Sequence, residues 1–122
     1  MKDLPPDAQN MLSQLQQLQQ QLQSVMNQKR QAEAYQQEAE EALEEVQNVG
    51  GEVPMYKATG NVLVKAEKDK LVSELEEKKE TYGLRVKTLE RQENKLREKL
   101  EELQNKLQSM FSSGSEQSGT GE

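Results

Sequence analysis

Residues 72–110 read VSELEEKKETYGLRVKTLERQENKLREKLEELQNKLQSM, and this stretch decides the fold. Its seam positions recur at steps of three and four residues, which is the seven-residue repeat of a coiled-coil helix. They are Val72, Leu75, Lys79, Tyr82, Val86, Leu89, Glu93, Leu96, Leu100, Leu103, Leu107 and Met110. A helix of this kind buries its apolar stripe only against another helix, so the stretch requires a partner helix.

The N-terminal part of the chain offers that partner. Pro5 and Pro6, followed by Asp7, suit the entry to a helix. A seam with the same spacing then runs through Ala8, Met11, Leu15, Leu18, Leu22, Val25, Lys29, Ala32, Gln36, Ala39, Leu43 and Val46. The side chains in the first half of this seam are mostly large and apolar, whereas the second half contains Lys29, Gln36 and two alanines. The glutamines that fill the first half predict a neutral, solvated helix face.

The segment between the two helices predicts a β-hairpin. Asn48-Val49-Gly50-Gly51 ends the first helix. Two β-prone runs, 53–59 and 62–66, flank Gly60-Asn61, which suits a two-residue turn with glycine first. An isolated hairpin is only marginally stable in water, so this one needs a larger sheet than a single chain supplies. The residues expected to build that sheet are Tyr56, Gly60, Val62, Leu63 and Val64.

These patterns predict a mostly α fold, in which a long antiparallel two-helix coiled coil is joined by one β-hairpin. We divide the chain into a first helix (1–49), the hairpin segment (50–68), a second helix (69–111) and a disordered tail (112–122). The favoured register places Leu15 near Leu103 and Gln36 near Tyr82, and a shift by one heptad stays open. Gly83, inside the second helix, costs about 1 kcal/mol relative to alanine and indicates a close approach or a slight bend.

Composition excludes several function classes. The chain has 122 residues, with 32% hydrophobic, 31% charged and 3% aromatic residues, and it contains neither cysteine nor histidine. Disulfides, thiol chemistry and histidine-based zinc sites or catalysis are therefore excluded. The net charge of −6 is spread over interspersed signs, which disfavours nucleic acid as a partner. No long apolar run or signal-like start occurs, so we expect a cytoplasmic protein with no membrane partner.

Enzyme chemistry finds no support either. A two-helix coil offers no sheltered pocket in which catalytic groups converge. The carboxylates Glu40, Glu41, Glu44 and Glu45 are typical of an ordinary solvated helix surface rather than of a metal or acid–base site. Basic residues between 85 and 99 alternate with glutamates, which predicts a salt-bridged surface. We expect no enzyme activity, no cofactor and no metal.

The two outer helix ends carry apolar residues beyond the needs of a seam. In an antiparallel pair these ends meet, and flexible methionine, leucine and phenylalanine side chains there form an adaptable apolar surface. The residues are Met11, Leu12, Leu15, Leu107, Met110 and Phe111. A coil that simply runs to its end explains them about as well as a binding surface does.

Several motifs resemble archaeal prefoldin β subunits. LPP at 4–6, followed by LQQLQQQL at 15–22, is similar to the opening of those proteins, and VPMYKATGNVLVK at 53–65 looks like their single hairpin. EKKE at 77–80 and RVKTLERQE at 85–93 look like their second helix. The resemblance covers nearly the whole chain except the tail from Ser112.

This resemblance implies a co-chaperone subunit. Two α and four β subunits would form a hexamer in which the hairpins build an intersubunit β-barrel and coiled coils extend from it. The coil tips would hold non-native client proteins and deliver them to a group II chaperonin without ATP. Tyr56, Val62, Leu63 and Val64 would help form the barrel, and the six apolar helix-end residues would lie at or near the client-binding tip. The competing interpretation is a structural coiled-coil spacer that binds no client.

Overall fold

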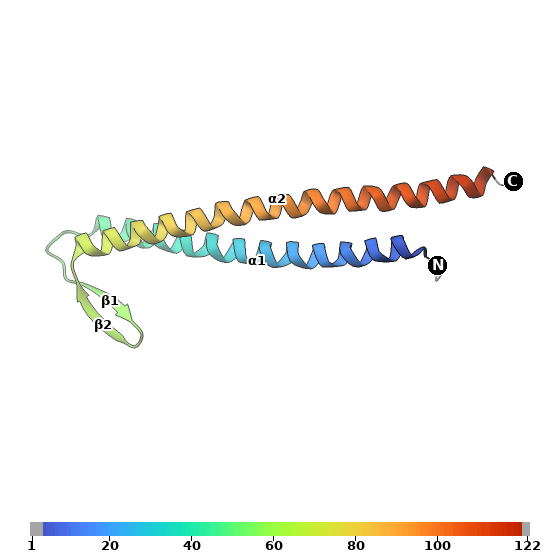
Figure 1. The fold of residues 1–122 in the computed structure, drawn as a ribbon. Helices are drawn as coiled ribbons and strands as arrows, with labels where there is room; N and C mark the ends of the chain where they lie inside the picture. Colours follow the sequence, from blue (N-terminus) through green and yellow to red (C-terminus); the bar gives the residue numbers. More distant parts are fainter. Residues whose placement is uncertain (1–3, 121–122) are drawn as a thin grey trace. The chain divides into compact units, whose positions relative to one another are not determined.

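The computed structural model describes the backbone of residues 4–120 and the side chains of residues 4–112. The elements follow in the order α1 (Pro6–Asn48), β1 (Met55–Thr59), β2 (Val62–Ala66) and α2 (Lys68–Thr120). Figure 1 shows two long helices with the hairpin inserted between them. The predicted mostly α fold, with two long helices joined by one hairpin, is confirmed.

Helix α1 begins as its sequence predicts. Pro6 is its first residue, where the missing N–H of proline costs nothing, and Asp7 lies in the first turn. The backbone N–H of Gln9 donates to the carbonyl of Pro5 at 3.0 Å, and the Gln9 side chain donates to the carbonyl of Leu4 at 3.0 Å. These bonds fix the entry of the chain into the helix.

The end of α1 is held by a lysine from α2. The last turn of α1 has no basic residue of its own. The Lys68 ammonium donates to the carbonyls of Val49 at 2.7 Å and Gln47 at 3.3 Å. A cation at the carbonyl end of a helix is favoured by the helix dipole and satisfies carbonyls that have no partner within the helix. Lys68 thereby ties the start of α2 to the end of α1.

The hairpin has the predicted strands and turn. Gly60 has a φ of 61°, and no residue other than glycine has a positive φ in the described part of the chain. That is the conformation a two-residue turn with glycine first requires. The antiparallel register pairs Met55 with Ala66, Tyr56 with Lys65, Lys57 with Val64, Ala58 with Leu63 and Thr59 with Val62.

The chain divides into two compact units, and each helix contributes to both. The first unit combines Met1–Asn27 with Leu89–Glu122, and the second is Gln28–Thr88, which includes the hairpin. The buried hydrophobic residues of the first unit are Ala8, Leu89, Leu100, Leu103 and Leu107, and those of the second are Ala32, Ala39 and Leu43. All eight occupy predicted seam positions, so the seven-residue pattern identified the buried stripe of both helices.

Contacts in the second unit agree with the favoured register. The rings of Tyr35 and Tyr82 lie 5.2 Å apart between centroids. A Cβ atom added to Gly83 would lie 2.8 Å from the side-chain nitrogen of Gln36. Gln36 therefore packs against the turn that contains Tyr82 and Gly83.

Helix α2 extends beyond its predicted end. The sequence placed the end of the helix at Phe111 and a disordered tail after it, whereas the backbone is helical through Thr120. Of the tail, residues 121 and 122 lie outside the described residues.

Candidate functional site

The helix ends in the first unit form the first candidate site. In Figure 1 the start of α1 and the later part of α2 run side by side, and α2 continues beyond the start of α1. Of the six predicted residues, Phe111 is the most exposed, at 48%. Met11, Leu12, Leu15 and Met110 are half-buried. We call these five residues the helix-end surface.

Leu107 does not belong to that surface. Its side chain is only 6% exposed, because it takes part in the buried seam. A leucine in this position stabilises the pairing of the helices and offers little area to another molecule. Sequence reasoning could not separate Leu107 from Met110, since both are seam positions near a helix end.

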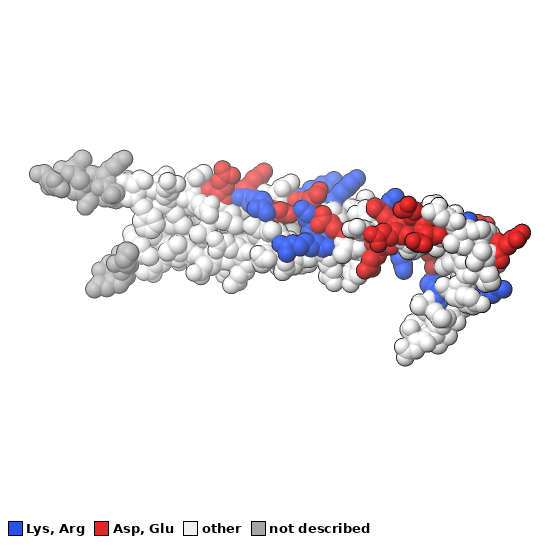
Figure 2. Space-filling view, turned by 180° about the vertical axis from the view of Figure 1, so that it is seen from behind, with Lys and Arg blue, Asp and Glu red and all other residues white. Residues whose placement is uncertain are grey.

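The surroundings of the helix-end surface carry little charge. Residues 8–28 of α1 contain no charged side chain, and neither do residues 107–115. Figure 2 shows a face on which basic and acidic side chains intermix, and a broad uncharged area lies next to the helix ends. A surface of methionine, leucine, phenylalanine and neutral amides can meet partners of either charge without desolvating an ion.

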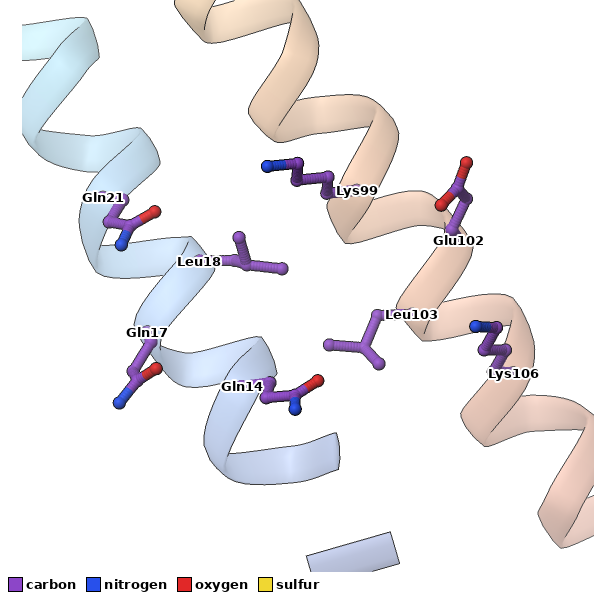
Figure 3. A pocket seen from close by; sticks show the side chains of 8 residues that line it. All are labelled: Gln14, Gln17, Leu18, Gln21, Lys99, Glu102, Leu103 and Lys106. Carbon is purple, nitrogen blue, oxygen red and sulfur yellow. The ribbon is translucent and has the colours of Figure 1, made fainter. Parts of the chain in front are cut away.

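A shallow hollow lies between α1 and α2 in the same unit. It has a volume of about 300 Å³ and is lined by Gln14, Gln17, Leu18, Gln21, Lys99, Glu102, Leu103 and Lys106. Figure 3 shows Leu18 and Leu103 pointing toward one another across the space between the helices. Sequence analysis treated the glutamines as a solvated face, which is correct for their exposure. It missed that Gln14, Gln17 and Gln21, at helical spacing, border an apolar floor.

The hairpin in the second unit forms the second candidate site. Tyr56, Val62, Leu63 and Val64 are each between 50% and 71% exposed, and Gly60 makes the turn. Residues that pair directly across two strands point to the same face of the sheet. The pairing therefore defines a leucine face (Tyr56, Ala58, Leu63, Lys65) and a valine face (Met55, Lys57, Thr59, Val62, Val64, Ala66).

One ion pair joins the hairpin to α2. The Lys57 ammonium donates to a carboxylate oxygen of Glu74 at 2.7 Å. This hydrogen bond and the positive charge of Lys57 lower the pKa of Glu74, and Lys78 and Lys70 lower it further by smaller amounts. Both side chains are exposed to solvent, so the pair positions the hairpin more than it stabilises the fold.

Leu84 is an exposed apolar residue that the sequence analysis did not single out. It lies in α2 of the second unit, off the seam, and is 59% exposed. It lies two residues from each of the seam residues Tyr82 and Val86, so it points away from the partner helix. This spacing is the signal by which the sequence could have shown that Leu84 is exposed. Single exposed apolar residues are common on soluble proteins, so Leu84 alone marks no site.

The described residues also bear on a metal site and on a membrane-spanning helix. Among the side chains that the structure describes, residues 4–112, no group of three or more His, Cys, Asp or Glu is placed to hold a metal ion. Glu40, Glu41, Glu44 and Glu45 are exposed helix surface, as the sequence indicated. Neither of the described helices has an apolar stretch long enough to span a bilayer.

Comparison with known proteins gives one consistent result. The prefoldin subunit family matches residues 9–114. The prefoldin subunit beta of Archaeoglobus fulgidus is 57% identical over 112 residues, which cover 92% of this chain and 97% of the relative. That of Methanocella arvoryzae is 52% identical over 109 residues, covering 89% of this chain and 86% of the relative.

Solved structures agree with the sequence comparison. The prefoldin beta subunit from Thermococcus strain KS-1 superposes with a TM-score of 0.83 at 46% identity, covering 90% of this chain and 96% of that one. The beta2 subunit from the same strain has a TM-score of 0.67 at 23% identity and supports the fold alone. The resemblance read from the hairpin and the second-helix motifs is confirmed: the chain belongs to the prefoldin family of chaperone subunits, as a member of the β type.

Proposed function

We propose that this chain is a subunit of an ATP-independent holdase, which captures non-native proteins at the helix-end surface and transfers them to a group II chaperonin. The observation that carries this proposal is the combination of half-exposed apolar side chains with surroundings of little charge at the helix ends. A protein that binds many different sequences needs mobile apolar groups rather than one shaped pocket. Methionine and phenylalanine on two adjoining helix ends provide such groups.

The hairpin is the proposed assembly element. Its two-stranded sheet has two open edges, and apolar side chains are exposed on both of its faces. Open edges and uncovered apolar faces favour pairing with other sheets. We assign Tyr56, Val62, Leu63 and Val64 to an intersubunit β-barrel in a hexamer of two α and four β subunits. The proposal places this complex in the cytoplasm.

Assembly and capture support one another in this scheme. A single helix-end surface offers little apolar area, so one arm would bind a client weakly. Several such surfaces on one body raise the total affinity through effective concentration, while each arm can still release separately. Release without ATP then needs only a competing surface, such as that of the chaperonin.

The test is suppression of aggregation by matched variants in the assembled complex. A chemically denatured enzyme is diluted into buffer that contains the complex, and light scattering is followed. Phe111→Ser should weaken suppression several-fold, because it removes the most exposed ring of the helix-end surface. Leu84→Ser removes a similarly exposed apolar residue from the second unit and should change little. Equal effects of the two variants would contradict capture at the helix ends.

The same light-scattering assay on the wild-type complex also distinguishes a holdase from a structural coiled-coil spacer. A structural spacer that binds no client would leave the aggregation of the denatured enzyme unchanged. Such a result would favour the spacer, which the burial of Leu107 in the seam also fits.

A further inference from the structure

A second hollow adjoins the one in Figure 3, along the helix pair of the first unit. It has a volume of about 380 Å³ and shares Gln21 and Lys99 with the first hollow. Its lining residues are Gln21, Ser24, Val25, Gln92, Lys95, Leu96 and Lys99. Because the two hollows meet at shared residues, they form one continuous groove between α1 and α2, which we call the seam groove.

The floor of the seam groove consists of seam residues that two helices do not fully cover. Leu18 and Leu103 form its first part, and Val25 and Leu96 form its second. Leu103 is buried, whereas the other three side chains are only half-buried. On each helix the two floor residues are seven positions apart, which is the spacing against which another helix packs in a coiled coil. Covering this floor would remove further apolar area from water.

The two walls of the seam groove differ in charge. The α1 wall is neutral, whereas the α2 wall contains three lysines and one glutamate: Lys95, Lys99, Lys106 and Glu102. None of these four forms an ion pair with another side chain among residues 4–112. Figure 3 shows Lys99 reaching toward α1, whereas Glu102 points away from the gap. The α2 wall therefore carries an excess of positive charge that no described side chain neutralises.

The length of the groove and the placement of its lysines indicate the shape of an occupant. The groove runs along α1 from Gln14 to Val25, which at 1.5 Å per residue is about 17 Å, or about three helical turns. The lysines follow one another at steps of four and seven residues, so they lie along one edge of α2. A helix laid in the groove would meet positive charge along one of its edges and neutral amides along the other.

We propose that the seam groove docks an amphipathic helix of another protein, about three turns long, whose apolar stripe covers the floor and whose acidic edge faces the three lysines. None of the five residues of the helix-end surface lines this groove. The occupant also differs from a non-native client, because it has a fixed secondary structure and a fixed pattern of charge. The inference therefore goes beyond the proposed function and does not depend on it.

The test measures the binding of a fluorescent synthetic peptide to the full-length chain by anisotropy. The peptide forms about three helical turns, with leucines at heptad spacing and glutamates along one edge. The control peptide has glutamine at each glutamate position. The acidic peptide should bind at least about tenfold more tightly than the control. Equal affinities, or no binding of the acidic peptide at millimolar concentration, would overturn the proposal.

A matched pair of charge reversals then locates the site. Lys99→Glu changes the lysine that both hollows share, and it should weaken binding of the acidic peptide about tenfold. Lys87→Glu makes the same change of net charge at an exposed position of the second unit and should weaken binding less than about twofold. Equal losses would show a general electrostatic attraction and would overturn the groove as the site.

A third variant should act in the opposite direction. Glu102→Gln removes the one acidic side chain of the α2 wall, so the acidic peptide should bind about two- to threefold more tightly. A loss of folded structure cannot produce such a gain, which makes this variant a check on the other two. Unchanged or weaker binding by Glu102→Gln would contradict the role given to the charge of this wall.

A last comparison separates the groove from the helix-end surface. Phe111→Ser should leave the affinity for the acidic peptide unchanged, and Lys99→Glu should leave the suppression of aggregation unchanged. If Phe111→Ser weakens peptide binding as much as Lys99→Glu does, the peptide binds at the helix ends and the groove proposal fails. Loss of aggregation suppression in Phe111→Ser alone would support capture at the helix ends and leave the groove as a separate site.

Discussion

The two units of this chain use the same seven-residue pattern to different effect. The first unit buries four leucines and one alanine, and of its large apolar residues with described side chains only Phe111 is exposed. The second unit buries two alanines and one leucine and exposes a series of large apolar residues: Tyr35, Val53, Tyr56, Val62, Leu63, Val64 and Leu84. The first unit therefore buries most of its large seam residues, whereas the second unit leaves several large apolar side chains in contact with solvent.

The difference shows how one sequence period can serve two purposes. Leucine at seam positions gives each helix pair its own cohesion, as in residues 96–107. Alanine at Ala32 and Ala39 fills the seam with little apolar area, so helix pairing there contributes less free energy. In the proposed assembly, association through the hairpin would compensate, and the stability of the second unit would depend on assembly.

The largest expected effect is the loss of a seam leucine from the first unit. Leu103→Ala should lower the free energy of unfolding by about 2–4 kcal/mol, because it removes a buried side chain and leaves a cavity. Urea unfolding followed by circular dichroism measures this loss. Leu84→Ala is the matched control in the second unit. Its free energy of unfolding should stay within about 0.5 kcal/mol of that of the wild type. Losses of the same size at both positions would remove the contrast between the units.

A smaller effect is expected where the second unit depends on a polar contact. Lys68→Met keeps the length of the side chain but removes the donor to the carbonyls of Val49 and Gln47. We expect a loss of about 1 kcal/mol in the free energy of unfolding. Lys87→Met, at an exposed position of α2, serves as the control. Thermal unfolding measures both, and an unchanged midpoint for Lys68→Met would show that the end of α1 needs no cation.

A substitution at Gly83 is expected to raise the free energy of unfolding rather than to lower it. Gly83→Ala should stabilise α2 by up to about 1 kcal/mol, since alanine is the better helix former. The new Cβ atom meets only the side-chain end of Gln36, which can move aside. The gain should be larger in a Gln36→Ala background, where no displacement is needed. Destabilisation by Gly83→Ala in both backgrounds would show that the helices approach too closely for any side chain.

The smallest effect concerns pH and the attachment of the hairpin. Because the pKa of Glu74 is lowered in the folded chain, its pairing with Lys57 stabilises the fold at pH values above the ordinary carboxyl pKa. That contribution is lost as the pH falls through the lowered pKa. Resonances of Lys57 and the hairpin in NMR spectra should shift over this acidic range in wild type. They should not shift in Glu74→Gln, and identical titrations of the two proteins would rule out the pair.

Local periodicity made most of this fold predictable from the sequence. Spacings of three and four residues identified the eight buried hydrophobic residues among the described side chains. Gly60-Asn61 between β-prone runs identified the strands and the turn. These features depend on neighbouring residues and on elementary backbone geometry. The helix-end residues stay a prediction as a binding surface: Phe111 is exposed, whereas Leu107 is buried in the seam.

Features that depend on three-dimensional placement were not predictable in the same way. No local pattern joins Lys68 to the carbonyls at the end of α1, or Lys57 to Glu74, because each pair meets only after the chain has turned. The sequence placed the end of the second helix at Phe111, because serine and glycine composition predicts a coil, whereas α2 runs to Thr120.

The central claim is that assembly resides in the second unit and leaves the helix ends of the first unit free. Native mass spectrometry of a chain shortened to residues 15–103, mixed with the α subunit, tests it most directly. The account predicts a complex with the same number of subunits as the full-length chain forms. Separate subunits, from a shortened chain that retains its helix content, would show that the helix ends are needed for assembly and would contradict the account.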